Sequence, residues 1–256
     1  MKLRIPKSKP KKFGMEEIQQ KIINKKLSNR YIHTKNDNRI FNVLLEDYKL
    51  QVNCGNKTGY SNSRTYFDYN LLLNSVYKTK TTILERIATY AKLQNKKVIK
   101  VLDDGAGKGN FLGALKKIWK YHTNKNHIKT KLETNAIVLN SKEVNKTNQI
   151  DNIYSGDISE FNPKQKFDFI FSVYGATTYT ITELRTEVFL KHLYSLEKGG
   201  YGFFSTPIEI NNDKMNQIIL NLKKRGFIAK YHDLKNDFSL NEKNQPTKMI
   251  VIQRIK

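Results

Sequence analysis

The sequence has a single cysteine, Cys54, and no long hydrophobic run among its 256 residues. One cysteine excludes an internal disulfide and any metal site built from several cysteines. No apolar stretch approaches the roughly 20 residues that a membrane-spanning helix needs, and no apolar signal-peptide core follows the basic start. The five histidines are scattered without metal-ligand spacing. We therefore expect a cytoplasmic protein with no membrane contact and no metal site.

Acidic residues are also scarce, since 23 Asp and Glu stand against 46 Lys and Arg, for a net charge of +23. Residues 1–100 hold 22 basic and 7 acidic residues, whereas residues 151–200 hold 5 and 7. A basic front end favours an anionic partner, with nucleic acid first. The alternative is compositional, because Lys, Asn and Ile are abundant throughout and much lysine then belongs to the solvated surface. Both interpretations stay open from the sequence.

Residues 1–79 are predicted to form a basic N-terminal extension. Residues 1–12 carry six basic residues and two prolines, which is typical of a flexible basic arm. Residues 28–65 are polar, and we expect them to cap the site or to face the substrate. The spacing of apolar residues predicts an amphipathic helix over Thr81–Leu93, which leads into a second domain, residues 80–256.

The most informative stretch is a predicted strand, a glycine-rich turn and a predicted helix in direct succession. Lys97 to Leu102 alternate and then run apolar, as a buried strand does. Three glycines follow at every second position, and from Asn110 apolar residues recur at helical spacing. Glycines allow a tight turn and let a ligand approach the amides at the positive end of the helix. This unit predicts a nucleotide-binding α/β fold.

The spacing of the glycines distinguishes between the known kinds of glycine-rich nucleotide-binding turn. The dinucleotide fingerprint needs a third glycine where Asn110 stands, and the P-loop needs Ser or Thr after a Gly-Lys pair, whereas Gly109 follows Lys108 here. What remains is an acidic residue at the strand end, Asp103, followed by the three alternating glycines. This pattern resembles motif I of the class I S-adenosylmethionine-dependent methyltransferases.

The resemblance covers about residues 80–256. It implies an α/β fold with a seven-stranded Rossmann-like methyltransferase sheet flanked by helices, here with a basic N-terminal extension, and an enzyme that uses S-adenosylmethionine. The later strands are expected in the family's order, with the last two as an antiparallel pair. Their predicted ranges are Ile128–Leu132, Asp151–Phe161, Phe167–Tyr174, Tyr201–Ser205, Phe227–Tyr231 and Lys248–Ile255.

The resemblance also assigns roles to single residues. Asp103 and the glycine turn would hold the amino-acid end of the cofactor. Glu133, expected at the end of the second strand, would accept hydrogen bonds from the two ribose hydroxyls; Asp157 would bind the adenine amino group and Ile158 the ring face. A surface glutamate and a turn-capping aspartate are the alternatives for these carboxylates. The full expected cofactor-binding set is Asp103, Gly105, Ala106, Gly107, Gly109, Glu133, Asp157, Ile158 and Tyr174.

One position departs from the family pattern. Asp104 stands where the family has an apolar residue, and it would compete with Asp103 if the strand register were shifted by one. Beyond the cofactor, Tyr174 and Tyr179 are the candidates to line the methyl-acceptor site, by position only. No general base is identifiable.

Signatures of particular acceptors are missing. No Asn/Asp-Pro-Pro-aromatic tetrad follows the fourth strand, and Cys54 is not in a Pro-Cys pair, which argues against amino-methylating and cytosine-C5 DNA enzymes. Three hypotheses remain: a methyltransferase acting on nucleic acid, RNA first, through the basic N-terminal region; one acting on a protein side chain or small molecule; and a non-catalytic scaffold. The joint presence of Asp103, Gly105, Gly107, Glu133 and Asp157 argues against the scaffold. The oligomeric state is not specified by the sequence.

Overall fold

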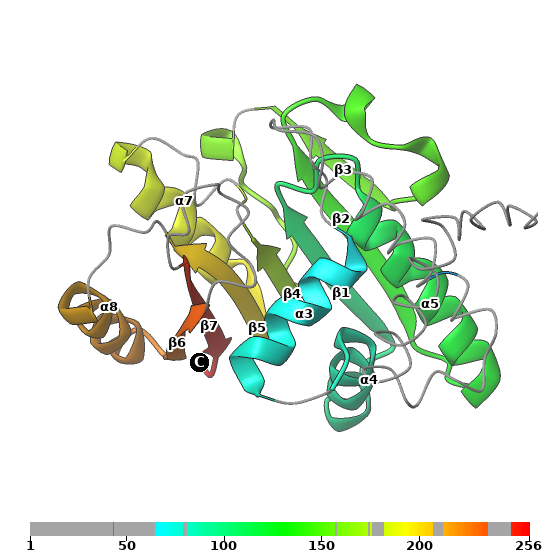
Figure 1. Ribbon diagram of the computed structural model, residues 1–256, viewed down its shortest axis with the longest axis horizontal. Coiled ribbons are helices and arrows are strands. Elements are labelled where there is room, and N and C mark those ends of the chain that lie inside the picture. Colours follow the sequence, from blue (N-terminus) through cyan, green and yellow to red (C-terminus); the bar gives the residue numbers. More distant parts are fainter. Residues whose placement is uncertain are drawn as a thin grey trace, which may run out of the picture.

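The computed structural model describes residues 43, 65–78, 81–156, 158–173, 175, 182–206, 212–234 and 247–256. These residues form a mixed α/β structure around one seven-stranded sheet (Figure 1). Most of the expected N-terminal extension, including the basic arm, lies outside the described residues. Across the described ranges, every helix is too short or too polar to cross a membrane.

The sheet has the strand order β3-β2-β1-β4-β5-β7-β6. Strands β1 to β5 pair in parallel, and β7 runs antiparallel to both of its neighbours. The strands are β1 Val98–Asp104, β2 Lys131–Val138, β3 Asn152–Ser155, β4 Phe167–Ser172, β5 Leu196–Thr206, β6 Phe227–Leu234 and β7 Thr247–Arg254. The predicted seven-stranded fold and its antiparallel last pair are confirmed. The strand order reverses between β1 and β4, where open α/β sheets bind ligands outside the carboxyl ends of the strands.

Helices cover both faces of the sheet. They are α3 Tyr66–Tyr77, α4 Ile83–Leu93, α5 Asn110–Asn126, α7 Thr182–Tyr194 and α8 Asn212–Lys224, with short 3₁₀ helices η2 Ser141–Glu143, η3 Lys146–Asn148 and η4 Ile158–Glu160. Alternate residues of each strand point to opposite faces. Val101 and Phe171 therefore pack with α3, α4 and α5, whereas Leu102 and Ile170 pack with α7 and α8.

Helix α3 belongs to the core of the sheet domain. Figure 1 shows it crossing one face of the sheet. The Tyr69 ring stacks on Phe111 of α5 with centroids 4.0 Å apart, and both rings lie in one buried cluster with β1. Burial raises the pKa of Tyr66 to about 12, and its hydroxyl oxygen accepts the Leu84 amide of α4 (3.1 Å). The expected boundary between residues 79 and 80 therefore runs through one packed core.

Three predicted strands have clearly different bounds in the structure. The third, predicted as Asp151–Phe161, spans only Asn152–Ser155, and the short helix η4 follows it. The prediction that the second strand spans Ile128–Leu132 is wrong, because β2 begins at Lys131 and continues to Val138. The prediction that the fifth strand begins at Tyr201 is also wrong, since β5 begins at Leu196 and passes through Gly199, whose φ is +83°. The pairing of β4 with β5 shifts register there, as an irregularity with a left-handed glycine allows.

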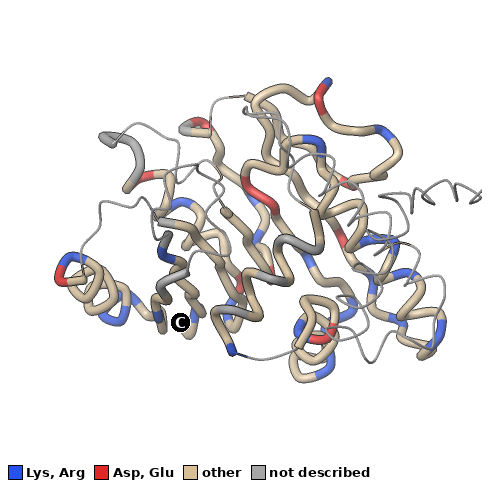
Figure 2. Tube along the Cα trace, viewed as in Figure 1, with Lys and Arg blue, Asp and Glu red and all other residues tan. Residues whose placement is uncertain are grey.

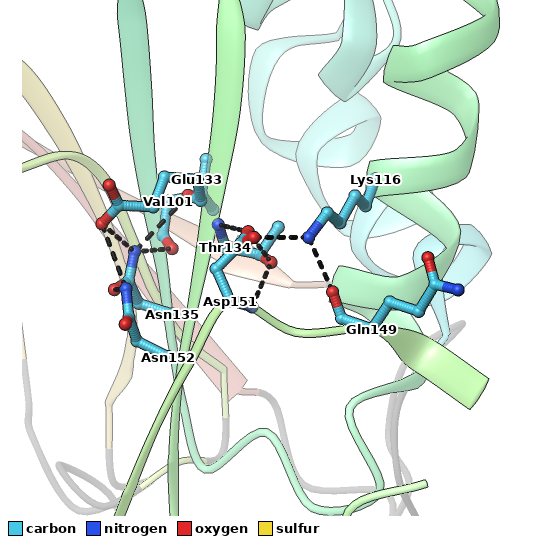
Figure 3. A network of polar contacts seen from close by, with 8 residues as sticks. All are labelled: Val101, Lys116, Glu133, Thr134, Asn135, Gln149, Asp151 and Asn152. Atoms are coloured by element: carbon cyan, nitrogen blue, oxygen red, sulfur yellow. Dashed lines mark hydrogen bonds and ion pairs between the residues drawn. The ribbon is translucent and has the colours of Figure 1, made fainter. Parts of the chain in front are cut away.

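Asp151 connects β2, β3 and α5 (Figure 3). Its carboxylate accepts the Thr134 amide and hydroxyl, each at 2.8 Å, and pairs with Lys116 at 2.6 Å. Burial alone would raise its pKa, but the Lys116 and Thr134 hydrogen bonds outweigh burial and hold the pKa below its ordinary value. The ionised carboxylate thus stabilises the fold.

The stabilisation by Asp151 is expected to depend on pH. It is fully present above the ordinary carboxyl pKa of about 4 and is lost as the pH falls through the lower folded-state value. In urea unfolding, Asp151→Asn should therefore be less stable than the wild type at neutral pH, and the gap should be narrower at a pH below the ordinary carboxyl pKa of about 4. Lys116→Gln should reproduce part of the effect. A gap of equal size at both pH values would contradict this account.

Candidate functional site

The carboxyl end of β1 places the glycine turn at the point where the strand order reverses. Gly105, Gly107 and Gly109 have φ values of +84°, +52° and +72°, a region that favours glycine because a side chain is strained there. The Gly105 and Ala106 amides both donate to the Ile137 carbonyl at 3.1 Å. The turn is thereby tied to the end of β2.

Gly109 marks the start of α5 and is buried. Its amide donates to the Ala106 carbonyl at 2.8 Å, which closes the turn. A Cβ at Gly109 would collide with the Ile150 side chain. The last glycine of the motif is therefore favoured by its left-handed backbone conformation, and the end of the Ile150 side chain would have to move to admit a Cβ.

Asp103 lies at the end of β1 and its side chain is buried. The Tyr69 hydroxyl donates to its Oδ1 at 2.6 Å. The Tyr69 ring is itself held by stacking on Phe111 and by an edge contact with Phe171 at 5.6 Å. A side chain from α3, which the sequence analysis placed outside the catalytic domain, thus orients the motif carboxylate.

Asp104 is completely buried and points to the opposite face of the sheet. Its Oδ2 accepts the Ser172 hydroxyl at 2.7 Å and lies 3.5 Å from His192 Nε2. The other ring nitrogen of His192, Nδ1, is 2.7 Å from the Val188 carbonyl, a contact that requires a proton on Nδ1. Because the two aspartates face opposite sides and have different partners, a shift of one residue would not interchange them.

The chain after β4 passes directly against the end of β1. A Cβ at Gly175 would collide with the Asp104 carbonyl oxygen. The neighbouring Asp104 Oδ1 is buried and has no hydrogen-bond partner among the residues that the structure describes. Backbone atoms from the exits of β1 and β4 therefore meet at the switch point, next to this buried carboxylate.

The expectation that Glu133 ends the second strand is wrong. Glu133 pairs in register with Lys100, and β2 continues five residues further to Val138, which is about 16 Å along a strand. Its Oε1 lies 3.4 Å and 3.3 Å from the amide nitrogens of Asn135 and Asn152 (Figure 3). Glu133 therefore cannot bind a ribose at the carboxyl ends of the strands.

The residues that do follow β2 break the family pattern. Leu139 is 83% exposed, and the Asn140 side chain caps η2 by accepting the Lys142 amide. The first carboxylate beyond the strand is Glu143, which is exposed in η2. The second strand thus ends without the acidic residue that the resemblance implies.

Of the remaining expected site residues, the structure describes only some. Ile158 is half-buried in η4 and packs against the cluster beneath α7 and α8, so it follows β3 rather than lying in it. Asp157, Tyr174 and Tyr179 lie outside the described residues. Tyr69, Ser172 and His192 were missed by the sequence analysis, because only tertiary contacts bring them to the two aspartates.

Comparison with known proteins shows which fold this chain shares with solved structures. No protein-family model matches the sequence, and no curated protein matches it. Among solved structures, a protein from Listeria monocytogenes assigned to the class I S-adenosylmethionine-dependent methyltransferases is 12% identical; the match covers 78% of this chain and 63% of that chain, with a TM-score of 0.51. An rRNA methylase from Streptococcus thermophilus is 15% identical over 66% of this chain and 95% of that chain, with a TM-score of 0.44.

A third similar structure is an S-adenosylmethionine-dependent methyltransferase from Clostridium acetobutylicum, which is 13% identical over 74% of this chain and 99% of that chain, with a TM-score of 0.43. Identities this low carry information on architecture alone, and the Listeria structure is the one of these three whose TM-score supports it. The chain has the Rossmann-like fold of the class I S-adenosylmethionine-dependent methyltransferases.

Proposed function

We propose that the protein is an S-adenosylmethionine-dependent methyltransferase whose acceptor is a nucleic acid, RNA first. The observation that carries the proposal is the buried Asp103 carboxylate, fixed by Tyr69 beside a left-handed glycine turn at the switch point of the sheet. A carboxylate fixed beside a glycine turn suits a ligand with an ammonium group, because the turn leaves room for close approach and the carboxylate supplies the opposite charge.

The residues expected to bind the cofactor keep their proposed roles with one exception. Asp103, Gly105, Ala106, Gly107 and Gly109 would hold its amino-acid end. Ile158 and Asp157 would meet the adenine, and Tyr174 with Tyr179 would line the acceptor side. Glu133 has no role, so the ribose hydroxyls need other acceptors.

The cofactor, when bound, supplies a methyl group on a positively charged sulfur that is already activated for in-line displacement. The protein's part is to orient the two reactants, which can account for several kcal/mol of the barrier. The rigid elements needed for this are present. Tyr69 fixes Asp103, and the Ile137 carbonyl fixes the turn through two amides. We therefore expect positioning, rather than proton transfer from a described residue, to be the chain's main contribution.

Charge supports the choice of acceptor. The net charge of +23 and the surplus of basic over acidic residues in residues 1–100 favour a polyanion. A polyanionic substrate would be attracted over distances that a neutral metabolite would not sense. Nucleic acid is the commonest large polyanion that carries methylatable atoms, and it is therefore the acceptor to test first.

The proposal is tested by following transfer of a radiolabelled methyl group from S-adenosylmethionine to total RNA, to DNA and to a protein extract. We expect label in RNA with the wild type and none with Gly107→Val, because a β-branched residue is strained at φ +52°. Label found only in DNA, or only in protein, would show that this fraction contains the acceptor and that RNA does not. No label in any fraction, from folded protein, would overturn the proposed activity.

A further inference from the structure

Three basic side chains converge on Tyr194, the last residue of α7. Lys166 Nζ donates to the Tyr194 carbonyl at 2.6 Å, and Arg254 Nη1 donates to the same oxygen at 3.2 Å. Arg225 Nη1 donates to the Tyr194 hydroxyl at 3.3 Å. The three cations come from the segment before β4, the turn after α8 and the end of β7. Tertiary folding therefore assembles this basic cluster from distant parts of the sequence.

The basic cluster has no acidic partner among the described side chains. The ion pairs of the described ranges involve other residues, and Arg254 instead donates to the carbonyls of Leu196 (2.7 Å) and Lys256 (2.7 Å). Next to the cluster, the backbone amide of Lys256 donates to the Gly226 carbonyl at 3.3 Å. Figure 2 shows Lys and Arg positions beside this end of the chain. Like charges held together repel each other, so an anion bound there would relieve that repulsion.

The nearest carboxylate along the chain does not neutralise the cluster. Glu197 follows Leu196, which packs with α7, so strand alternation directs Glu197 to the other face. There it adds to the electrostatic environment of Tyr90 in α4. The face that carries Tyr194 is therefore basic and has no compensating carboxylate side chain among the described residues.

An aromatic ring lies at the centre of the cluster. Tyr194 is 42% exposed, and the inner edge of its ring is fixed by Phe227 with centroids 5.9 Å apart. Proteins that bind single-stranded nucleic acid combine cations along the phosphate backbone with aromatic rings on which bases stack. Arg suits phosphate because its planar group can make two parallel hydrogen bonds.

We propose that Lys166, Arg225, Arg254 and Tyr194 form a docking site for a nucleic-acid strand, with phosphates on the cations and an unpaired base on the ring. The site lies at the amino ends of the parallel strands. Strand β4 runs from beside Lys166 to Ser172 at the candidate methyl-transfer end, a separation of about 20 Å for its six residues. This inference rests on the proposed function and adds that the substrate is longer than that separation.

The test is a titration of the full chain with fluorescently labelled single strands of about 16 nucleotides, as RNA and as DNA, over a range of salt concentrations. Lys166→Gln/Arg225→Gln should bind the strand roughly tenfold more weakly near 0.1 M salt. The plot of the logarithm of the binding constant against the logarithm of the salt concentration should also be shallower by about 1.4, because each of the two lost phosphate contacts contributes about 0.7 to its slope. Tyr194→Leu keeps an apolar contact with Phe227 but should weaken binding by a similar factor. The strand that binds more tightly identifies the nucleic acid.

The matched control is Lys117→Gln/Lys120→Gln, which removes the same charge from the exposed face of α5. An equal loss of affinity in the control, or no loss in the cluster variant, would overturn the docking site. Binding of S-adenosylmethionine is measured on the same proteins and should be unchanged in both. If the wild type binds the strand but not S-adenosylmethionine, the proposed activity fails while the docking site stands.

Discussion

An Asp168→Ala variant is expected to lose about 3–5 kcal/mol of its free energy of unfolding, because it leaves several buried partners unpaired. Asp168 is 2% exposed at the start of β4. Its oxygens accept the Tyr90 hydroxyl at 2.9 Å and the Lys100 amide at 2.8 Å, and it pairs with Lys96 at 2.9 Å. Since domains of this kind have only about 5–15 kcal/mol in total, the loss should be visible in any denaturant titration.

Two further variants show that the loss comes from this network. Tyr90→Phe removes one donor and should cost only about 1 kcal/mol. Asp213→Ala removes an exposed carboxylate from the first turn of α8 and should cost less than about 1 kcal/mol. Burial, followed by the neighbouring Asp168 carboxylate, raises the pKa of Tyr90, so its hydroxyl stays a donor at neutral pH. If Asp168→Ala were as stable as Asp213→Ala, this network would not stabilise the fold.

The second large effect is expected on cofactor affinity. Asp103→Asn keeps the shape of the side chain and an acceptor for Tyr69, but it removes the negative charge at the end of β1. A hydrogen bond to a charged group contributes about 1.5–3 kcal/mol, so the Kd for S-adenosylmethionine should rise roughly 10- to 100-fold. Isothermal calorimetry measures this change directly.

The control for Asp103→Asn is Asp151→Asn, the same chemical change at a carboxylate that contacts Lys116 and Thr134 instead. It should leave the Kd unchanged. Circular dichroism and thermal unfolding establish that both variants are folded before titration. Equal Kd values for the wild type and Asp103→Asn would show that Asp103 does not contact the cofactor.

The sheet could be predicted from the sequence because its strongest patterns are local. The strand before Asp103 is apolar, and the glycines have the spacing of a known turn, so strand, turn and helix are defined within one short stretch. The antiparallel last pair follows from the same resemblance. The strand, the turn and the helix depend on neighbours in the sequence and need no knowledge of tertiary contacts, whereas the antiparallel pair came from the resemblance alone.

The bounds of β2 could not be predicted, because polar residues inside it resemble a strand end. Thr134 and Asn135 are fully buried, but their polar atoms are satisfied by residues far along the chain. Asp151 accepts from Thr134, while the side-chain amides of Asn152 and Gln165 donate to the side-chain oxygen Oδ1 of Asn135 at 2.9 Å and 3.0 Å. That error moved the strand end to Leu132 and gave Glu133 a role that its position does not allow.

The partners of Asp103 and Asp104 could not be predicted either, because they too lie far along the chain. Tyr69 precedes Asp103 by 34 residues, and Ser172 follows Asp104 by 68. Tyr66 and Tyr69 lie in a segment rich in aromatic and aliphatic residues, but nothing in the spacing of these residues shows that α3 crosses the sheet. Only the packing of α3 on α5 makes Tyr69 a partner of the motif carboxylate.

The central claim is that the carboxyl end of β1 binds S-adenosylmethionine. A calorimetric titration of the folded wild-type chain with S-adenosylmethionine, with and without RNA present, tests it most directly. We expect one binding site per chain, with a Kd in the micromolar range that rises in Asp103→Asn. Absence of binding both with and without RNA would contradict the account and leave the fold as a scaffold without its cofactor.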